Sequence, residues 1–146
     1  MVPVSAIQMK NYSSDIFDRH FRRAFKALFD RDRGHLEFNI TALIVRGGKV
    51  LSVGFNRHDL REITRSFKSN DWNNTHAEVD AIVRARNKID LSGSKMYVAR
   101  MTEYGQIRMA RPCEMCQTII SMYGIKRALY TIDDTSFGTM HIRRRQ

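Results

Sequence analysis

The sequence predicts a single α/β domain in which helices cover a sheet. β-branched, apolar stretches alternate with amphipathic stretches of helical periodicity, and two metal-ligand motifs each stand where a helix is expected to begin. The chain has 146 residues, of which 42% are hydrophobic and 10% aromatic, which is enough for one core. Because internal repeats and low-complexity segments are absent, we expect one domain over residues 1–146, with its core at about 38–132.

An amphipathic helix is expected first, at about residues 14–33, after Ser13 and Ser14. One face is apolar, formed by Phe17, Phe21, Ala24, Phe25 and Leu28. The other faces are basic, with Arg19, Arg22, Arg23, Lys26 and Arg33. We expect this helix to cover one face of the sheet, and a helix lying on a membrane surface is the alternative.

The strands follow from apolar runs bounded by turn residues. Phe38 to Arg46 and Lys49 to Phe55 flank Gly47-Gly48, which is the signal of a β-hairpin. A polar loop, Asn56 to Asn74, comes next. Further strands are expected at Lys95 to Met101, at Lys126 to Ile132 and, as a short fifth, at Thr139 to Arg143. Strands separated by helices favour parallel neighbours in the sheet.

The first motif, His76-Ala77-Glu78, is expected to open a helix. Thr75 is a plausible N-cap, and the residues after the motif are rich in alanine and aliphatic side chains. His76 and Glu78 would then lie in the first turn, where the helix dipole is positive.

The second motif, Pro112-Cys113-Glu114-Met115-Cys116, is expected to open another helix. Pro112 suits the first helical position, and cysteines spaced i, i+3 lie on one face of the first turn. Gly124 is a suitable residue to end this helix.

A basic tail, with Arg143, Arg144 and Arg145, closes the chain.

His76, Cys113 and Cys116 are the residue types that bind Zn²⁺. Three protein ligands leave the fourth tetrahedral position open to water, which is typical of a catalytic site rather than a structural one. Two alternatives are a redox pair of cysteines and a closed structural zinc site in which Glu78 or another histidine is the fourth ligand. Glu78 is more simply explained as a carboxylate that moves protons.

The order H-x-E…P-C-x-x-C is the signature of zinc-dependent nucleobase deaminases. Over about Phe38 to Ile132 the chain resembles the cytidine and deoxycytidylate deaminase superfamily, and His76 to Ile82 is similar to the zinc helix of its deoxycytidylate and tRNA-adenosine branches. The resemblance implies a cytidine deaminase-like three-layer α/β/α sandwich with a mixed, mostly five-stranded sheet. It also implies one zinc per chain, held between two helix N-termini.

The same resemblance implies site residues and a reaction. Asn56, at the end of the second strand, is similar to a substrate-contacting asparagine of those branches. The alternative is that Asn56 is a turn residue, since asparagine is common in turns. The backbone N–H of Ala77 would donate to the base carbonyl, and Glu78 would carry a proton from water to the ring. The implied reaction is hydrolytic deamination of cytosine in a free nucleotide, dCMP to dUMP with release of ammonia. Candidates for stacking on the base are Phe55, Trp72, Tyr104 and Tyr130.

Two departures from the family pattern bear on the substrate. Arg111 precedes Pro112, where the family more often has Ser, Thr or Glu, and Thr102 to Ala110 is an insertion before the cysteine helix. Arg111 either binds a phosphate or pairs with a nearby carboxylate. Further cations for a phosphate are Arg57, Arg61, Arg65 and Lys68 in the loop after Asn56.

The formal net charge of +10, from 25 Lys and Arg against 15 Asp and Glu, attracts phosphates. It leaves two further hypotheses beside the nucleotide enzyme. One is a polynucleotide deaminase that binds single-stranded DNA or RNA through the basic surface and acts on cytosine, or on adenosine in tRNA. The other is a zinc-stabilised binding module without activity.

Composition also bears on location and assembly. Two cysteines committed to a metal leave no disulfide framework, which favours a reducing, cytoplasmic location. No apolar stretch is long enough to span a membrane, and the N-terminal residues lack the layout of a signal peptide. The resemblance implies a homo-oligomer, because family members of this size commonly associate.

Overall fold

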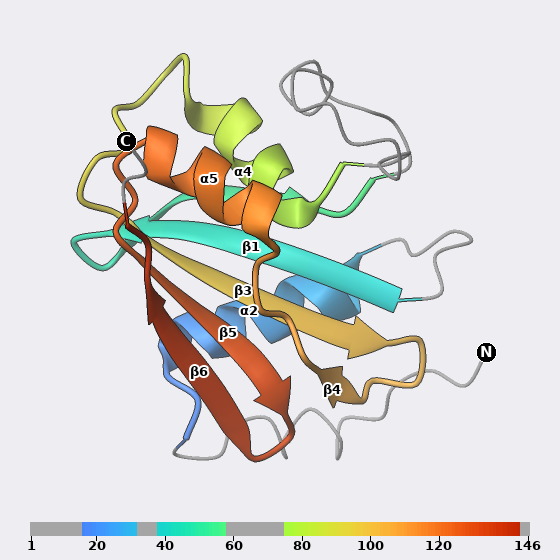
Figure 1. Ribbon diagram of the computed structural model, residues 1–146. Coiled ribbons are helices and arrows are strands. Elements are labelled where there is room, and N and C mark those ends of the chain that lie inside the picture. Colours follow the sequence, from blue (N-terminus) through green and yellow to red (C-terminus); the bar gives the residue numbers. More distant parts are fainter. Residues whose placement is uncertain (1–15, 32–37, 58–74, 144–146) are drawn as a thin grey trace.

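The computed structural model describes residues 16–31, 38–57 and 75–143, and shows the predicted mixed α/β architecture (Figure 1). The strands run in the order β2-β1-β3-β5-β6, and the short β4 pairs with β3. Helix α2 lies on one face of the sheet, and α4 and α5 lie on the other. The bounds are α2 Arg19–Asp30, β1 Phe38–Arg46, β2 Lys49–Phe55, α4 Ala77–Ala85, β3 Lys95–Thr102, β4 Ile107–Arg108, α5 Glu114–Met122, β5 Arg127–Asp133 and β6 Ser136–His141.

The predicted hairpin is confirmed at both strands. β1 and β2 pair antiparallel from Thr41 opposite Phe55 to Arg46 opposite Lys49. Gly47 and Gly48 have φ of 58° and 77°, which only glycine adopts without strain at both central positions of such a turn.

β3 is the central strand and pairs in both directions. It runs antiparallel to β1 and parallel to β5, as expected for strands joined through a helix.

The prediction for the last strand was wrong in its bounds, because β6 starts at Ser136 rather than Thr139 and forms a hairpin with β5. Its turn carries no glycine; Asp133 Oδ1 accepts hydrogen bonds from Thr135 N and Ser136 Oγ instead. A turn held by an aspartate is a weaker sequence signal than Asn-Gly.

Helix α2 is shorter than predicted. Its N-cap is Asp18, whose Oδ1 accepts hydrogen bonds from His20 N and Phe21 N at 2.9 and 3.0 Å. Ser13, Ser14 and Arg33 lie outside the described residues. Phe17 precedes the helix, yet it is buried and packs edge-on against Phe25 at 5.0 Å. The predicted apolar face therefore forms the core beneath the sheet, as expected. None of the described helices is long and apolar enough to cross a membrane.

Helix α4 approaches β2 closely at Gly54. A Cβ at this glycine would lie 2.2 Å from Ala81 N and 2.5 Å from Ala77 O, so the strand and the helix are in backbone contact. Ser52 Oγ donates to Ala81 O at 2.7 Å, and Phe55 N donates to the buried Asp80 carboxylate at 3.0 Å. These contacts fix the start of α4 over the end of β2.

The predicted insertion, Thr102 to Ala110, forms a turn and the strand β4. β4 pairs with the last residues of β3, with Arg100 opposite Arg108. Thr131 of β5 joins the three strands: its hydroxyl accepts from Arg100 N at 3.2 Å and donates to Arg108 O at 2.8 Å. Ala110 N then donates to Thr131 O at 2.9 Å. The chain is thus anchored to the sheet just before it reaches Pro112.

Candidate functional site

The two motifs stand at helix N-termini, but α4 begins one residue later and α5 two residues later than predicted. His76, and not Thr75, is the N-cap of α4, because Thr75 is held in extended backbone by a bridge to Arg57. Cys113 is the N-cap of α5, so Pro112 precedes the helix instead of occupying its first position. Cys113 Sγ accepts from Cys116 N at 3.5 Å, as the side chain of a capping residue does.

His76, Cys113 and Cys116 converge as predicted, with ligand atoms all within 4.8 Å of one another. Nδ1 of His76 lies 3.5 Å from Cys116 Sγ and 3.9 Å from Cys113 Sγ. Tetrahedral Zn²⁺ with ordinary Zn–S and Zn–N distances would place such donors about 3.5 to 3.8 Å apart. The donor set and its spacing therefore fit zinc, and the three residues would hold one ion from both helix N-termini.

The two thiols differ in their protonation. A hydrogen bond from the Cys116 thiol lowers the pKa of Cys113 to about 4, although burial opposes this; His76 lowers it further. The same hydrogen bond and burial raise the pKa of Cys116. One thiolate is thus already favoured, and a thiolate is the form that binds a metal.

Glu78 lies two residues after His76 and is 5% exposed. Burial raises the pKa of its carboxyl, an effect that the nearby His76 partly offsets. Glu78 is not one of the three residues whose ligand atoms cluster within 4.8 Å. Its position beside the cluster, rather than in it, suits a group that accepts and releases a proton.

A cavity of about 290 Å³ opens beside these residues. Its lining includes five of the residues singled out from sequence for metal binding, catalysis or substrate contact, namely His76, Glu78, Cys113, Asn56 and Arg111. Met109 and Ala110 belong to the insertion that the sequence indicated, whereas the sequence gave no indication of the remaining lining residues, Ile40, Val98 and Arg100. Val98 and Arg100 are two positions apart on β3, and Ile40 lies opposite Arg100 on β1. Residues two apart on a strand, and residues directly opposite each other on paired strands, share one face of a sheet. The register of β1 and β3 would therefore have identified these three as lining residues.

The other predicted substrate contacts differ in whether the structure places them at the cavity. Ala77 begins α4 between two lining residues, and its N–H is one of those that a helix leaves without an intrahelical partner. Phe55, Tyr104 and Tyr130 are not among the described residues that line the cavity. Arg57 lies 3.8 Å from the carboxylate of Asp80. Arg61, Arg65, Lys68 and Trp72 lie outside the described residues.

A larger cavity, of about 620 Å³, lies at the opposite ends of the two helices. It is lined by residues such as Arg86, Tyr123 and Lys126 and includes none of the predicted site residues. We therefore place the chemistry in the smaller cavity, because only there do metal donors and a buried carboxylate meet.

Comparisons with known proteins agree with this geometry. A family model, the cytidine and deoxycytidylate deaminase zinc-binding region, matches residues 16–132. No curated protein matches the chain.

Two solved structures share the fold. Cytidine deaminase from Burkholderia pseudomallei is 18% identical, with a TM-score of 0.56 over 86% of this chain and 94% of its own. The dCMP deaminase of cyanophage S-TIM5, in complex with dCMP and dUMP, is 21% identical, with a TM-score of 0.50 over 78% of this chain and 82% of its own. In its apo form the phage enzyme aligns over 64% of its length.

The matching family model is that of a zinc-binding region, and His76, Cys113 and Cys116 form a site that could hold such an ion. The protein belongs to the cytidine and deoxycytidylate deaminase family.

Proposed function

We propose that the protein deaminates the cytosine base of a free nucleotide, converting dCMP to dUMP and ammonia. The observation that carries the proposal is the composition of the 290 Å³ cavity: Glu78, two of the metal-site residues (His76 and Cys113) and two arginines (Arg100 and Arg111) line the same small space. Such a volume is at the lower end for small-molecule sites, as suits one nucleotide. The ligand named for the phage enzyme, dCMP, supports the same choice.

The residues of the chain would divide the chemistry between them. When bound, zinc supplies the Lewis acid that makes water nucleophilic near neutral pH. Glu78 takes the proton that water loses on attack at C4 and delivers it to N3 of the ring. Glu78 then assists protonation of the amino group, which leaves C4 as ammonia. The N–H of Ala77 would hold the base carbonyl, so that C4 faces the site.

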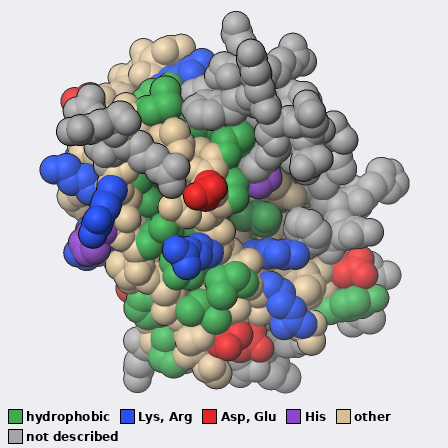
Figure 2. Space-filling model, in the orientation of Figure 1, with side chains coloured by type: hydrophobic (Ala, Val, Ile, Leu, Met, Phe, Trp, Pro, Cys, Tyr) green, Lys and Arg blue, Asp and Glu red, His purple; other side chains and the backbone are tan. Residues whose placement is uncertain are grey.

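Arg100 and Arg111 would bind the phosphate. Arg100 extends from the end of β3 on the face that the cavity occupies, and Arg111 is exposed immediately before α5. A guanidinium binds a phosphate with two parallel hydrogen bonds, and hydrogen bonds to charged groups contribute about 1.5–3 kcal/mol each. On the described part of the visible face, basic side chains stand in separate groups among hydrophobic ones (Figure 2).

A substrate panel tests the proposal. Zinc-loaded protein is incubated with dCMP, CMP, deoxycytidine, a single-stranded DNA containing cytosine and an RNA hairpin containing adenosine, and the deaminated products are measured. We expect dCMP to be converted at least tenfold more efficiently than deoxycytidine, because the nucleoside lacks the phosphate. Conversion of the oligonucleotide with dCMP untouched would replace the proposal with a polynucleotide deaminase.

Matched arginine variants locate the phosphate. Arg100→Gln and Arg111→Gln should each raise KM for dCMP about tenfold or more and leave any deoxycytidine turnover unchanged. Arg108→Gln is the control, because Arg108 lies opposite Arg100 in the sheet but its side chain contacts Gln106 instead of the cavity. Salt dependence adds a check: binding of one phosphate falls gently with salt, whereas a track of many phosphate contacts loses affinity steeply.

A further inference from the structure

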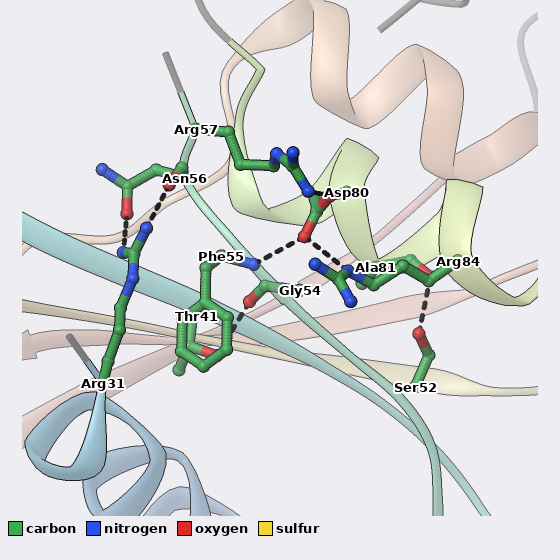
Figure 3. Close-up of polar contacts among 10 residues, drawn as sticks. All are labelled: Arg31, Thr41, Ser52, Gly54, Phe55, Asn56, Arg57, Asp80, Ala81 and Arg84. Carbon is green, nitrogen blue, oxygen red and sulfur yellow. Dashed lines mark hydrogen bonds and ion pairs between the residues drawn. The ribbon is translucent and has the colours of Figure 1, made fainter. Parts of the chain in front are cut away.

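Several arginines of the chain are held by partners within the fold. Arg84 Nε donates to the buried carboxylate of Asp80 at 2.9 Å, and Arg57 lies 3.8 Å from the other oxygen of that carboxylate (Figure 3). Arg31 Nη1 donates to the side-chain oxygen of Asn56 at 2.6 Å. The charge of these guanidiniums is therefore used inside the protein, at the junction of β2 and α4. A second set of cations, beside helix α2, is arranged differently.

A small cavity of about 100 Å³ lies between α2 and the turn that joins β1 to β2. It is lined by Arg19, His20 and Arg23 of the helix and by Gly48 of the turn. Gly48 offers only backbone to the wall, and a Cβ there would lie 2.7 Å from Arg19 Nη2. Two guanidiniums and an imidazole around a space of this size suit an anion such as a phosphate group.

Two strand residues extend the positive charge across the sheet. Lys95 begins β3 and Arg127 begins β5, and the two lie directly opposite each other in this parallel pair. Lys95 is two positions before Tyr97, whose ring centroid lies 5.2 Å from that of His20, so Lys95 shares the face of the sheet that α2 covers. We call four exposed residues the basic cluster, namely Arg19, Arg23, Lys95 and Arg127.

The members of the basic cluster on α2 and β3 act together on His20. Burial lowers the pKa of His20, and Asp18 raises it. Three cations of the cluster lower this pKa further, namely Arg19, Arg23 and Lys95. An imidazole whose protonation is opposed by several neighbouring cations lies in a region of positive potential. The helix and the strand therefore contribute to one field.

Within the described part of the chain, no carboxylate forms an ion pair with any member of the basic cluster. Asp18 is engaged elsewhere, because its Oδ1 caps α2 and its Oδ2 accepts from the Tyr97 hydroxyl at 2.6 Å. Lys95 and Arg127 face each other as like charges, which destabilises the pairing of two strands. A bound anion would offset that repulsion, so the cluster is more favourable with a ligand than without one.

The spread of the basic cluster indicates an extended anion. Lys95 and Arg127 are one strand spacing apart, about 4.8 Å at the backbone, and α2 adds its two arginines on the same face. Four cations on a helix and two strands exceed what one compact phosphate contacts, whereas a nucleic-acid backbone is a linear array of phosphates. Three of the four are arginines, whose planar guanidinium binds phosphate bidentately. Tyr97 beneath them is only 3% exposed, so its ring is not available for stacking on a base.

We propose that the basic cluster binds the phosphate backbone of a nucleic-acid strand, with one phosphate in the 100 Å³ cavity and its neighbours against Lys95 and Arg127. Binding depends on charge and not on base sequence. Lys95 and Arg100 are five positions apart on β3 and so lie on opposite faces of the sheet, which separates this surface from the 290 Å³ cavity. The protein is thus held on a nucleic acid while the candidate active site stays open to a free nucleotide. The proposal does not depend on the proposed deaminase substrate.

Fluorescence anisotropy over a range of salt concentrations tests the proposal. The probe is a labelled single-stranded oligonucleotide that contains only thymine, so it offers no base to deaminate, and the protein is the zinc-loaded full chain. We expect log K to fall with log salt with a slope of about −3, as four phosphate contacts on a single strand require. Arg19→Gln, Arg23→Gln, Lys95→Gln and Arg127→Gln should each weaken binding about fivefold at about 0.1 M salt and lower the slope by about 0.7.

Matched variants locate the surface. Arg22→Gln removes the same charge from the same helix, but residues two apart on a helix do not face the same way, so Arg22 lies away from His20 and should be neutral. Arg100→Gln and Arg111→Gln, at the other cavity, should leave the affinity for the oligonucleotide unchanged. Conversely, the four cluster variants should keep the wild-type turnover of whichever substrate the panel identifies.

A measurement without ligand guards against misfolded variants. Lys95→Gln removes the repulsion with Arg127, so it should keep or raise the unfolding midpoint while it weakens binding, and saturating oligonucleotide should raise the wild-type midpoint more than that of the variant. A lower midpoint for Lys95→Gln, without ligand, would contradict the unpaired state of the cluster.

Four results would overturn the proposal. The first is an equal loss of affinity in Arg22→Gln, and the second is a salt slope that the cluster variants leave unchanged. The third is complete displacement of the oligonucleotide by inorganic phosphate at equal concentration of phosphate groups, which would identify a site for one free anion. The fourth is equal or tighter binding of polyglutamate or of phosphatidylserine vesicles, which would identify an acidic protein or a membrane as the partner.

Discussion

At the scale of single residues, neighbours in the sequence occupy different positions in the candidate site. His76 ends the extended segment before α4 and turns Nδ1 toward the two thiols, whereas Glu78, two residues on, lies buried beside the cavity. The motif made these positions predictable because they depend on local spacing. Arg100 and Arg31 carried no such signal: Arg100 is found through the pairing of β3 and β1, and Arg31 donates a hydrogen bond to Asn56, 25 positions away.

The difference between a ligand and a proton carrier predicts opposite outcomes for two substitutions. Glu78→Gln should keep zinc and fold while turnover falls by about 10²- to 10⁴-fold, because the amide cannot accept the proton. Cys113→Ser should lose both zinc and stability, because the site joins α4 to α5. Zinc content by elemental analysis, circular dichroism and product formation measure all three properties.

Glu114→Gln is the control for these substitutions, as Glu114 is exposed in the first turn of α5 and does not line the cavity. Loss of zinc from Glu78→Gln would identify Glu78 as a ligand and the site as structural. Full zinc occupancy in Cys113→Ser would contradict the assignment of the metal site.

At the scale of elements, the sheet and helices were predictable where a pattern was long or a turn was glycine-rich. The bounds of β1 and β2 are those expected, and the helix that ends before Gly124 does so with φ of 74° at that glycine. The predictions failed at helix starts and at β6, where a bridge at Thr75 and a turn held by Asp133 decide the bounds. The start of α4 depends on a contact between distant segments, and the start of β6 depends on side-chain hydrogen bonds within a short turn. Local helix and strand propensities do not predict either kind of contact.

The close approach of β2 and α4 predicts a large effect for one methyl group. Gly54→Ala should lower the free energy of unfolding by about 3 kcal/mol and weaken zinc binding, because the added carbon would meet the backbone at Ala77 and Ala81 and displace the zinc helix. Chemical denaturation and competition with a zinc chelator measure the two effects.

Gly138→Ala is a matched substitution in the same sheet. Its added carbon would meet the end of the Tyr130 side chain, at 2.3 Å from Cζ, and that side chain is able to move. We expect its cost to be clearly smaller. Equal costs at both glycines would show that α4 adjusts its position over β2 freely.

At the scale of the whole molecule, the sequence predicted one domain and self-association, and both stay predictions. β2 and β6 each have a paired neighbour on one side only among the described strands. The described surface also exposes large apolar side chains, 37% to 60% accessible: Ile16, Tyr104, Met109, Met122 and Phe137. Such features favour contact with a second copy.

We therefore expect a dimer or a larger closed oligomer, because a homo-oligomer would cover both an edge and apolar surface. Light scattering coupled to size exclusion, over a range of protein concentrations, measures the mass. A constant mass near the 17.1 kDa of one chain would contradict the prediction.

The hydroxyl of Thr131 has a consequence for how much sequence variation the chain can accept beside it. By holding β3 and β4 together where β5 departs, it separates the turn at 103–106 from the cysteine motif that follows. Residues of that turn can be replaced, lengthened or shortened while Cys113 keeps its place over the sheet. The segment is thus a natural point for diversification by evolution or by library design, since variation there leaves the metal-site residues in place.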